Sequence, residues 1–306
     1  LINFKKEQIN FTQWDSLTDK TECINLKAIV PEAVLDFDNQ NQQLNISIPQ
    51  IYINKQPRGS VPASMWDSGI PAMMLSYNMN AYQSKNNGYD SKSFYTAINS
   101  GLNIGSWYLR HNGSYNWADG SGGRYSVLNT YIQHDLPRIS GRLVAGQSNT
   151  SGQLFDTVPF TGVQIASDER MLPESQRGYA PEIRGIAKTN AKVTVKQSGQ
   201  TIYETTVSPG SFVINDLYPT GYGGNLELLR PGSQRYSLSL GKLRSDSVSS
   251  DPNLVEATYQ RGFSNLITGY TGLQANKDYQ AVKVGTALGL QIGAIAFDVT
   301  QSQTHL

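Results

Sequence analysis

The sequence predicts an all-β protein: the strands of a transmembrane β-barrel, with a compact β-sandwich inserted between two of them. Three observations support this prediction. Charged residues make up only 16% of 306 residues, while glycine (28) and tyrosine (17) are frequent, which suits strands between lipid and water. Long segments alternate apolar with small polar residues. Between residues 168 and 217, apolar residues instead alternate strictly with charged and polar ones, as in Ala191–Lys196. On composition alone, a secreted β-sandwich protein remains an alternative.

The sequence gives no signal for an enzyme, a cofactor, a metal site or a nucleic-acid partner. Lys and Arg total 25 against 24 Asp and Glu, so no charged field indicates nucleic acid. His111, His134 and His305 lack a Ser or Cys in a recognisable nucleophile setting, and no metal-ligand spacing occurs. We interpret Asp168 and Glu169 as solvated turn residues. No window holds the ~18 consecutive apolar residues of a transmembrane helix.

Strands of two kinds precede the insertion. Residues 31–38 alternate towards a short strand at Leu44–Ile48, which Pro49 ends. The later strands are longer: at ~3.3 Å per residue, Phe94–Ile104 exceeds a usual soluble strand and fits a tilted membrane span. We count six such strands before the insertion: Met73–Ala81, Phe94–Ile104, an aromatic segment at 107–117, Tyr125–Asp135, Arg142–Gln147 and Phe160–Ser167.

The aromatic segment contains Trp107, Tyr108, Tyr115 and Trp117. Because Asn-Gly is a strong turn signal, we predict a turn at Asn112–Gly113 around which these rings cluster, with His111 in the turn. Such a cluster is typical of the aromatic girdle at a membrane interface. Aromatic cross-strand pairs of a soluble sheet are the alternative.

Five strands follow the insertion and bring the total to about eleven. The clearest is Val282–Ile292, in which Val282 and Val284 share one face while Lys283 and Gly285 share the other. A small, polar inner face is expected for a water-filled lumen and not for a sandwich core, which needs bulk, so it favours a barrel. The other four are Tyr236–Leu243, Val255–Arg261, Ile267–Gln274 and Ala294–Gln301.

The inserted segment carries the most specific motifs. Pro173 and Pro181 bound its start, and Gly178 and Gly185 are expected to loosen it. Its first motif runs through Leu172, Pro173, Ser175, Gln176, Arg177, Gly178, Pro181 and Gly185, and its second through Pro209, Gly210, Phe212, Ile214, Asn215 and Asp216. Both resemble signatures of the fimbrial outer-membrane ushers, where the first marks the passage from a barrel strand into the plug domain. Val193 and Val195 would belong to the plug body.

Two earlier motifs extend the resemblance. Leu44–Gln50 and Arg58–Ile70 are similar to usher elements that close the N-terminal domain and lead into the barrel. The second of them contains Trp66, Asp67, Gly69 and Ile70. The resemblance implies an N-terminal domain with its linker (1–58), barrel strands (59–175 and 234–306) and a plug (176–233), which the chain leaves through Arg230, Pro231 and Gly232.

The resemblance also implies a function. An usher lies in the bacterial outer membrane, in contact with its lipid and with its N-terminal part in the periplasm. It recruits periplasmic chaperone–pilus subunit complexes and passes the pilus subunits through its lumen. Subunits are transferred by exchange of donor strands, so no nucleotide cofactor is needed. The alternative, a secreted all-β adhesin or carbohydrate-binding sandwich, explains the aromatic residues and turns but not the small polar face of the long strands.

The chain departs from the family's pattern in ways that predict a piece of a longer protein. Leu1 follows no signal peptide and would begin inside the N-terminal domain. Cys23 would be one half of a disulfide whose partner precedes Leu1, although a lone buried thiol is the other interpretation. About eleven strands are present, whereas the family's barrel has about twenty-four, and the C-terminal domains are absent. Residues 224–227 pass directly into Leu228–Gly232, where ushers have a further plug strand and hairpin, so the completeness of the plug is in question.

Overall fold

The computed structural model describes residues 26–53, 57–86, 89–197, 200–218, 228–244, 252–290 and 293–304. Cys23, His305 and the junction at 224–227 lie outside these residues. The chain divides into two compact units. We call residues 1–60 with 173–221 the plug unit, and residues 61–172 with 222–306 the sheet unit.

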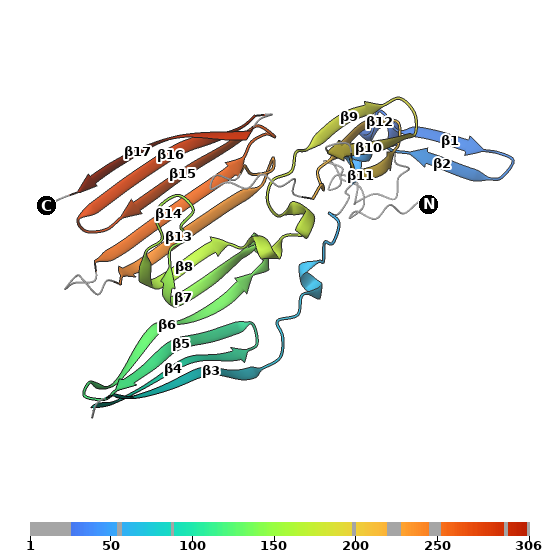
Figure 1. Cartoon of the computed structure of the whole chain (residues 1–306). Helices are drawn as coiled ribbons and strands as arrows, with labels where there is room; N and C mark the ends of the chain where they lie inside the picture. Colours follow the sequence, from blue (N-terminus) through green and yellow to red (C-terminus); the bar gives the residue numbers. More distant parts are fainter. Residues whose placement is uncertain are drawn as a thin grey trace. The chain divides into compact units, whose positions relative to one another are not determined.

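The sheet unit is one antiparallel sheet in which eleven strands are described, as the sequence predicts (Figure 1). Their order is β17-β16-β15-β14-β13-β8-β7-β6-β5-β4-β3, so the sheet is a meander that is interrupted once, between β8 and β13. The strands are β3 (Ala72–Asn86), β4 (Tyr89–Ile104), β5 (Trp107–Ala118), β6 (Gly122–Leu136), β7 (Gly141–Asn149), β8 (Pro159–Ser167), β13 (Gln234–Leu243), β14 (Asn253–Gly262), β15 (Ile267–Ala275), β16 (Tyr279–Leu290) and β17 (Gly293–Thr304). Three 3-10 turns belong to this unit: η2 (Ala63–Met65), η3 (Pro137–Ile139) and η4 (Glu169–Met171).

The predicted turn at Asn112–Gly113 is wrong, because β5 runs unbroken from Trp107 to Ala118. The register slips there by one residue, since Asn112 pairs with Asn129 and Gly113 with Val127. This leaves Leu128 as the extra residue of a β-bulge on β6. His111 therefore lies within a strand, where its ring nitrogens contact Thr130 Oγ1 and Tyr125 Oη, each at 2.6 Å.

Because β5 is one unbroken strand, its aromatic residues do not cluster around a single turn. Trp107 and Trp117 stand ten positions apart, near opposite ends of β5. At ~3.3 Å per residue and a tilt of ~40°, they are separated by about 25 Å along the membrane normal. That is the height of the apolar band between two aromatic girdles, so the rings fit two interfaces instead of one turn.

One face of the sheet carries a continuous row of apolar side chains. Directly opposed residues from β3 to β14 are Met73, Leu102, Leu109, Ile132, Ala145, Val163, Leu240 and Val255. Most are exposed, from 81% at Met73 to 37% at Leu102. A soluble monomer rarely exposes an apolar patch of this extent, whereas lipid-facing strands require one. The row crosses from β8 to β13 in register, so the insertion does not disturb the sheet.

The opposite face is small and polar, as predicted, but over β13–β16 it is covered rather than open to water. The loop between β7 and β8 crosses it: Lys283 Nζ donates to the carbonyl of Leu154 at 2.9 Å and lies 5.7 Å from the centroid of the Phe155 ring. A second segment, residues 228–233, lies on β14 and β15, where Leu229 N donates to Thr268 Oγ1 at 2.9 Å. These segments account for the burial of polar side chains such as Glu256.

The plug unit contains two small antiparallel sheets that pack into a sandwich. β9 (Ile183–Ala187) pairs with β12 (Gly210–Ile214), and β10 (Ala191–Gln197) pairs with β11 (Gln200–Val207). The shared core consists of Ala180, Tyr203, Ile214 and Leu217, with Ile183, Val193, Val195 and Phe212 packed against it. A 3-10 turn, η5 (Glu174–Gln176), precedes the sandwich.

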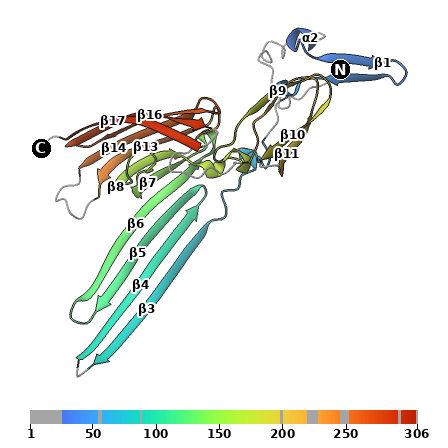
Figure 2. The ribbon, with the colours of Figure 1, turned by 45° about the horizontal axis from the view of Figure 1, so that its top comes forward.

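The N-terminal part of the plug unit is a hairpin with its own small core. β1 (Val34–Asp38) pairs with β2 (Gln43–Ser47), and the hairpin extends beyond the four plug strands (Figure 2). The helix α2 (Leu26–Ile29) and the turn η1 (Gln50–Tyr52) flank it. Leu26, Val30, Ala33 and Ile48 form the core. Among the residues described, no helix has the length and apolar character needed to cross a membrane.

Candidate functional site

The insertion leaves the sheet at the end of β8 and returns at the start of β13. These two strands pair directly, from Ser237 opposite Ala166 to Leu243 opposite Phe160. Tyr236 N donates to Ser167 Oγ at 3.1 Å, and the Tyr236 hydroxyl donates to the carbonyl of Ile139 in η3 at 2.8 Å. The two ends of the insertion are therefore fixed to each other and to the neighbouring corner of the sheet.

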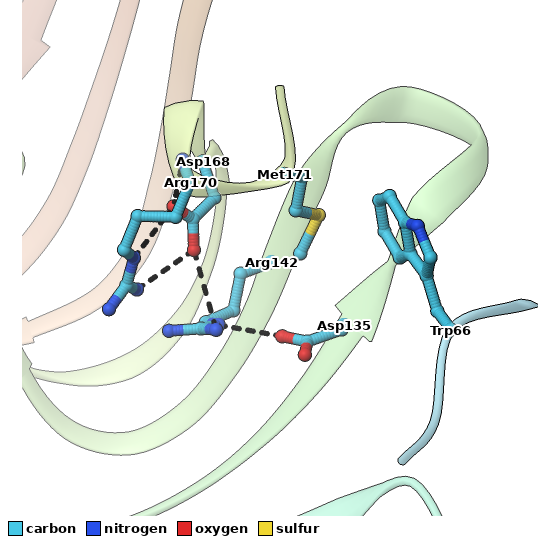
Figure 3. Close-up of a pocket in the computed structure, with 6 residues that line it drawn as sticks. All are labelled: Trp66, Asp135, Arg142, Asp168, Arg170 and Met171. Carbon is cyan, nitrogen blue, oxygen red and sulfur yellow. Dashed lines mark hydrogen bonds and ion pairs between the residues drawn. The ribbon is translucent and has the colours of Figure 1, made fainter. Parts of the chain in front are cut away.

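Side chains of alternating charge surround the place where the insertion leaves the sheet, at the end of β8. We call Asp135, Arg142, Asp168, Glu169, Arg170 and Arg235 the collar cluster. Arg142 Nε donates to Asp135 Oδ1 at 2.8 Å, and its Nη2 lies 3.4 Å from Asp168 Oδ2 (Figure 3). Arg170 contacts both oxygens of Asp168, at 2.9 and 2.8 Å. Arg235, from β13, pairs with Glu169. The cluster thus links β6, β7, β8 and β13 around the start of the insertion.

The collar cluster is electrically balanced, with three carboxylates facing three guanidinium groups. Four of its members line an open cavity of about 280 Å³ together with Trp66 and Met171: Asp135, Arg142, Asp168 and Arg170. Because the charges satisfy one another, the arrangement can hold the chain in place but offers no unpaired charge for an ionic ligand. Among the described residues, no group of three or more His, Cys, Asp or Glu side chains is placed to hold a metal ion.

The environment of Asp168 favours its charged form. The hydrogen bond from the Arg170 side chain is the largest effect lowering the pKa of Asp168, and Arg142 lowers it further by charge, while burial opposes them. In return, the hydrogen bond to Asp168 raises the pKa of Arg170. Both effects stabilise the ion pairs of the collar cluster at neutral pH.

Comparison with known proteins identifies the family. A family model described as outer membrane usher protein matches residues 95–229 and 227–306, and a model described as PapC N-terminal domain matches residues 3–81. The chain belongs to the outer membrane usher family. Its relatives include the usher HtrE of Escherichia coli K12, 41% identical over 93% of this chain, and the usher MrkC of Klebsiella pneumoniae, 40% identical over 85%. The chain spans about a third of these relatives, 36% of HtrE and 35% of MrkC.

Solved usher structures resemble the fold as well. A cryo-electron microscopy structure of an E. coli P pilus tip assembly intermediate, PapC-PapD-PapK-PapG, aligns with a TM-score of 0.61 and 29% identity. The alignment covers 96% of this chain and 41% of that one. The structure of the P pilus usher (PapC) translocation pore aligns with a TM-score of 0.50 and 31% identity, covering 76% and 53%. The usher fold and its place in the outer membrane therefore apply to this chain.

The usher motif at the start of the barrel forms a turn. Asp67 Oδ1 accepts a hydrogen bond from Gly69 N at 2.8 Å, and Gly69 adopts φ +82°. Glycine suits this left-handed conformation, which a side chain would strain. Trp66 Nε1 donates to the carbonyl of Val61 at 2.9 Å, while Ile70 is 77% exposed. These residues shape the approach to β3.

The motif at the start of the plug separates into two parts. Leu172 is the C-cap of η4 and Pro173 is the N-cap of η5, whose Ser175 is fully buried. Gln176 is the last residue of η5, and Arg177, Gly178 and Pro181 lie between η5 and β9. Gly185, which we expected to loosen the start, lies inside β9, where an added Cβ would come within 2.5 Å of the Phe212 ring. Its role is to leave room for that ring.

The second plug motif and the plug exit lie in different units. Gly210 to Ile214 form β12, preceded by Pro209, and Asn215 and Asp216 follow directly. Asp216 is 5% exposed. Arg230, Pro231 and Gly232 instead belong to the sheet unit, where Gly232 N donates to the carbonyl of Gly262 at 2.9 Å. The segment through which we expected the chain to leave the plug is thus fastened to β14.

The collar cluster was not predicted from the sequence. Asp168 and Glu169 are not solvated turn residues, since the Asp168 side chain is 11% exposed and both carboxylates pair with arginines. Arg142 and Arg235 reach them from other strands, and local sequence context does not reveal such partners. The available signal was the run Asp168–Arg170 placed where a spanning strand meets the insertion.

Proposed function

We propose that the full-length protein is a working usher, which recruits periplasmic chaperone–subunit complexes and assembles and translocates pilus subunits through a plugged β-barrel pore. Its N-terminal part would lie in the periplasm, and its partners would be chaperone–subunit complexes, pilus subunits in the lumen and outer-membrane lipid. It would work without enzymatic chemistry, because strand exchange between subunits supplies the free energy.

One observation carries the proposal. A small sandwich is inserted between β8 and β13, yet the two strands remain paired and the exposed apolar row continues across them. Because the flanking strands stay paired, the barrel wall can remain closed both when the insert fills the lumen and when it has moved out of it. The apolar row also argues against a secreted adhesin, since it would place a large exposed apolar face in water.

The test uses the full-length protein in a strain that lacks its own usher. Deleting residues 178–227 removes the plug but keeps the segment 228–233 that is fastened to β14. We expect the deletion to increase sensitivity to antibiotics that the outer membrane excludes, and to increase ionic current in planar bilayers. The intact protein should restore surface pili, counted by electron microscopy.

The matched control is Lys192→Ala, which removes an exposed ion pair between Lys192 and Glu204 at 2.7 Å within the same plug. Exposed pairs contribute little, at most about 1 kcal/mol, so this variant should keep low conductance and normal piliation. An unchanged conductance after the deletion would mean that the insert does not block the pore. Absence of pili with the intact protein and its cognate subunits would refute the assembly role.

A further inference from the structure

Arg58 joins the linker before the barrel to the plug. Its guanidinium lies 4.7 Å from the ring centroids of both Tyr203 and Tyr218. Arg58 Nη2 also donates to the carbonyl of Asp216 at 2.9 Å, and Nε lies 3.5 Å from Asp216 Oδ2. The backbone takes part too, since Ser175 Oγ donates to the carbonyl of Arg58 at 3.5 Å. One linker residue thus contacts both ends of the plug segment and its middle.

The carboxylate of Asp216 depends on this arginine. Its side chain is 8% exposed, and Oδ2 is buried without a hydrogen-bond partner in the described structure. A buried carboxylate that loses its counterion is strongly disfavoured. Removal of Arg58 would therefore favour movement of Asp216 towards water, which would loosen the end of the plug segment.

A second contact fastens the linker to the plug edge. Gln50 Oε1 accepts a hydrogen bond from Val213 N at 2.8 Å, so the linker caps a backbone donor of β12. Gly210 approaches the linker so closely that an added Cβ would come within 2.6 Å of Pro49. The linker, residues 49–53 and 57–60, therefore contacts the plug at two places. Gln50 binds the edge of the sandwich at β12, and Arg58 lies over the rings of Tyr203 and Tyr218.

We propose that Arg58 is a positioning residue that clamps the linker to the plug, so that residues 26–60 and the plug change position as one body relative to the barrel strands. The inference rests on the proposed function in one respect, since it assumes that the plug moves during assembly. Arginine suits the role because its planar group can lie over two rings while it donates to a carbonyl and a carboxylate.

The test measures distances between spin labels in the purified full-length usher. Labels are introduced through unnatural amino acids at Asn39, in the turn between β1 and β2, and at Lys188, between β9 and β10, so that native cysteines remain. We expect one narrow Asn39–Lys188 distance distribution in the wild type. Arg58→Ala and the isosteric Asp216→Asn should both broaden it, and Lys192→Ala should leave it unchanged.

Adding a chaperone–subunit complex separates this inference from the proposed function. A third label at Lys277, in the turn between β15 and β16, reports on the barrel. We expect the Lys188–Lys277 distance to change while Asn39–Lys188 stays fixed in the wild type. An unchanged Lys188–Lys277 distance would refute displacement of the plug from the barrel. The clamp would still be tested by whether the Asn39–Lys188 distribution broadens in the two variants. Narrow distributions in both variants, each with a heat-modifiable barrel that shows correct folding, would overturn the clamp.

Discussion

At the scale of residues, the most informative feature is the collar cluster, where arginines from neighbouring strands fix the departure of the plug segment. Arg142 is central because it contacts both Asp135 and Asp168. The cluster holds the last residues before the plug against the sheet. Movement of the plug should therefore begin after η4 and not at the end of β8.

The first prediction concerns Arg142→Ala. Without Arg142, Asp135 loses its hydrogen-bonded partner and Asp168 loses one of two cations. We expect a loss of about 1–3 kcal/mol in the free energy of unfolding, the range for a hydrogen bond to a charged group. Urea unfolding of the full-length protein in detergent measures it. Lys92→Ala, at an exposed pair 3.8 Å long, is the control and should cost under about 1 kcal/mol. Equal losses in the two variants would contradict the role of the cluster.

The second prediction concerns pH. Because the pKa of Asp168 is lowered in the folded state, the folded protein holds this proton less tightly than the unfolded chain does. The resulting stability is fully present above the unfolded pKa of about 4 and is lost as the pH falls through the folded pKa. We expect the urea midpoint of Asp168→Asn to depend less on pH below about 4 than that of the wild type. Parallel curves for the two proteins would rule out a stabilising contribution from the charged Asp168.

At the scale of elements, the pairing of β8 with β13 depends on a close backbone approach. Gly162 lies directly opposite Gly241. A Cβ on Gly162 would come within 2.0 Å of the Leu240 carbonyl, and one on Gly241 within 2.3 Å of the Thr161 carbonyl. These contacts are with backbone, which cannot move aside without disturbing the strand pair. The strands that flank the plug thus require glycine at this point.

The third prediction follows from that contact. Gly241→Ala should destabilise the folded barrel by about 1–3 kcal/mol, the usual cost of overpacking, and lower the temperature at which heat-modifiable migration is lost. Gly289→Ala is a matched control on β16, because its added Cβ would come within 2.8 Å of the flexible end of Leu228 but no nearer than 3.4 Å to any backbone atom. If both variants lose the folded form at the same temperature, the close approach is not important for stability.

The elements also show what the sequence could predict. Period-two alternation of apolar and small polar residues locates the eleven strands, and burial follows it most clearly in β14, where every second residue is buried. It fails at Asn112–Gly113, where a strong local turn signal is overridden by pairing with β6. There the Tyr125 ring lies so close to Gly113 that an added Cβ would come within 2.3 Å of its hydroxyl. A glycine that makes room for a ring and a glycine that makes a turn look alike in sequence.

At the scale of the whole molecule, the plug motifs in the sequence indicate the insertion, but not what the linker contacts. Arg58 and Asp216 are 158 positions apart, and neither is unusual in its local context. Residues 1–58, which the sequence predicts to be an N-terminal domain with its linker, lie in one compact unit with residues 173–221. Contacts between such distant residues depend on tertiary folding, which periodicity does not reveal.

The central claim is that one face of the sheet meets lipid, so the most direct measurement is spin-label accessibility along β16 of the full-length protein in bilayers. The fourth prediction is that labels at Val282, Val284 and Leu290, which are 47%, 58% and 47% exposed, collide freely with oxygen and little with a water-soluble nickel reagent. Labels at Ala281, Lys283 and Ala287, on the covered face, should collide far less with oxygen. High collision rates with the nickel reagent at Val282, Val284 and Leu290 would place that face in water and contradict the account.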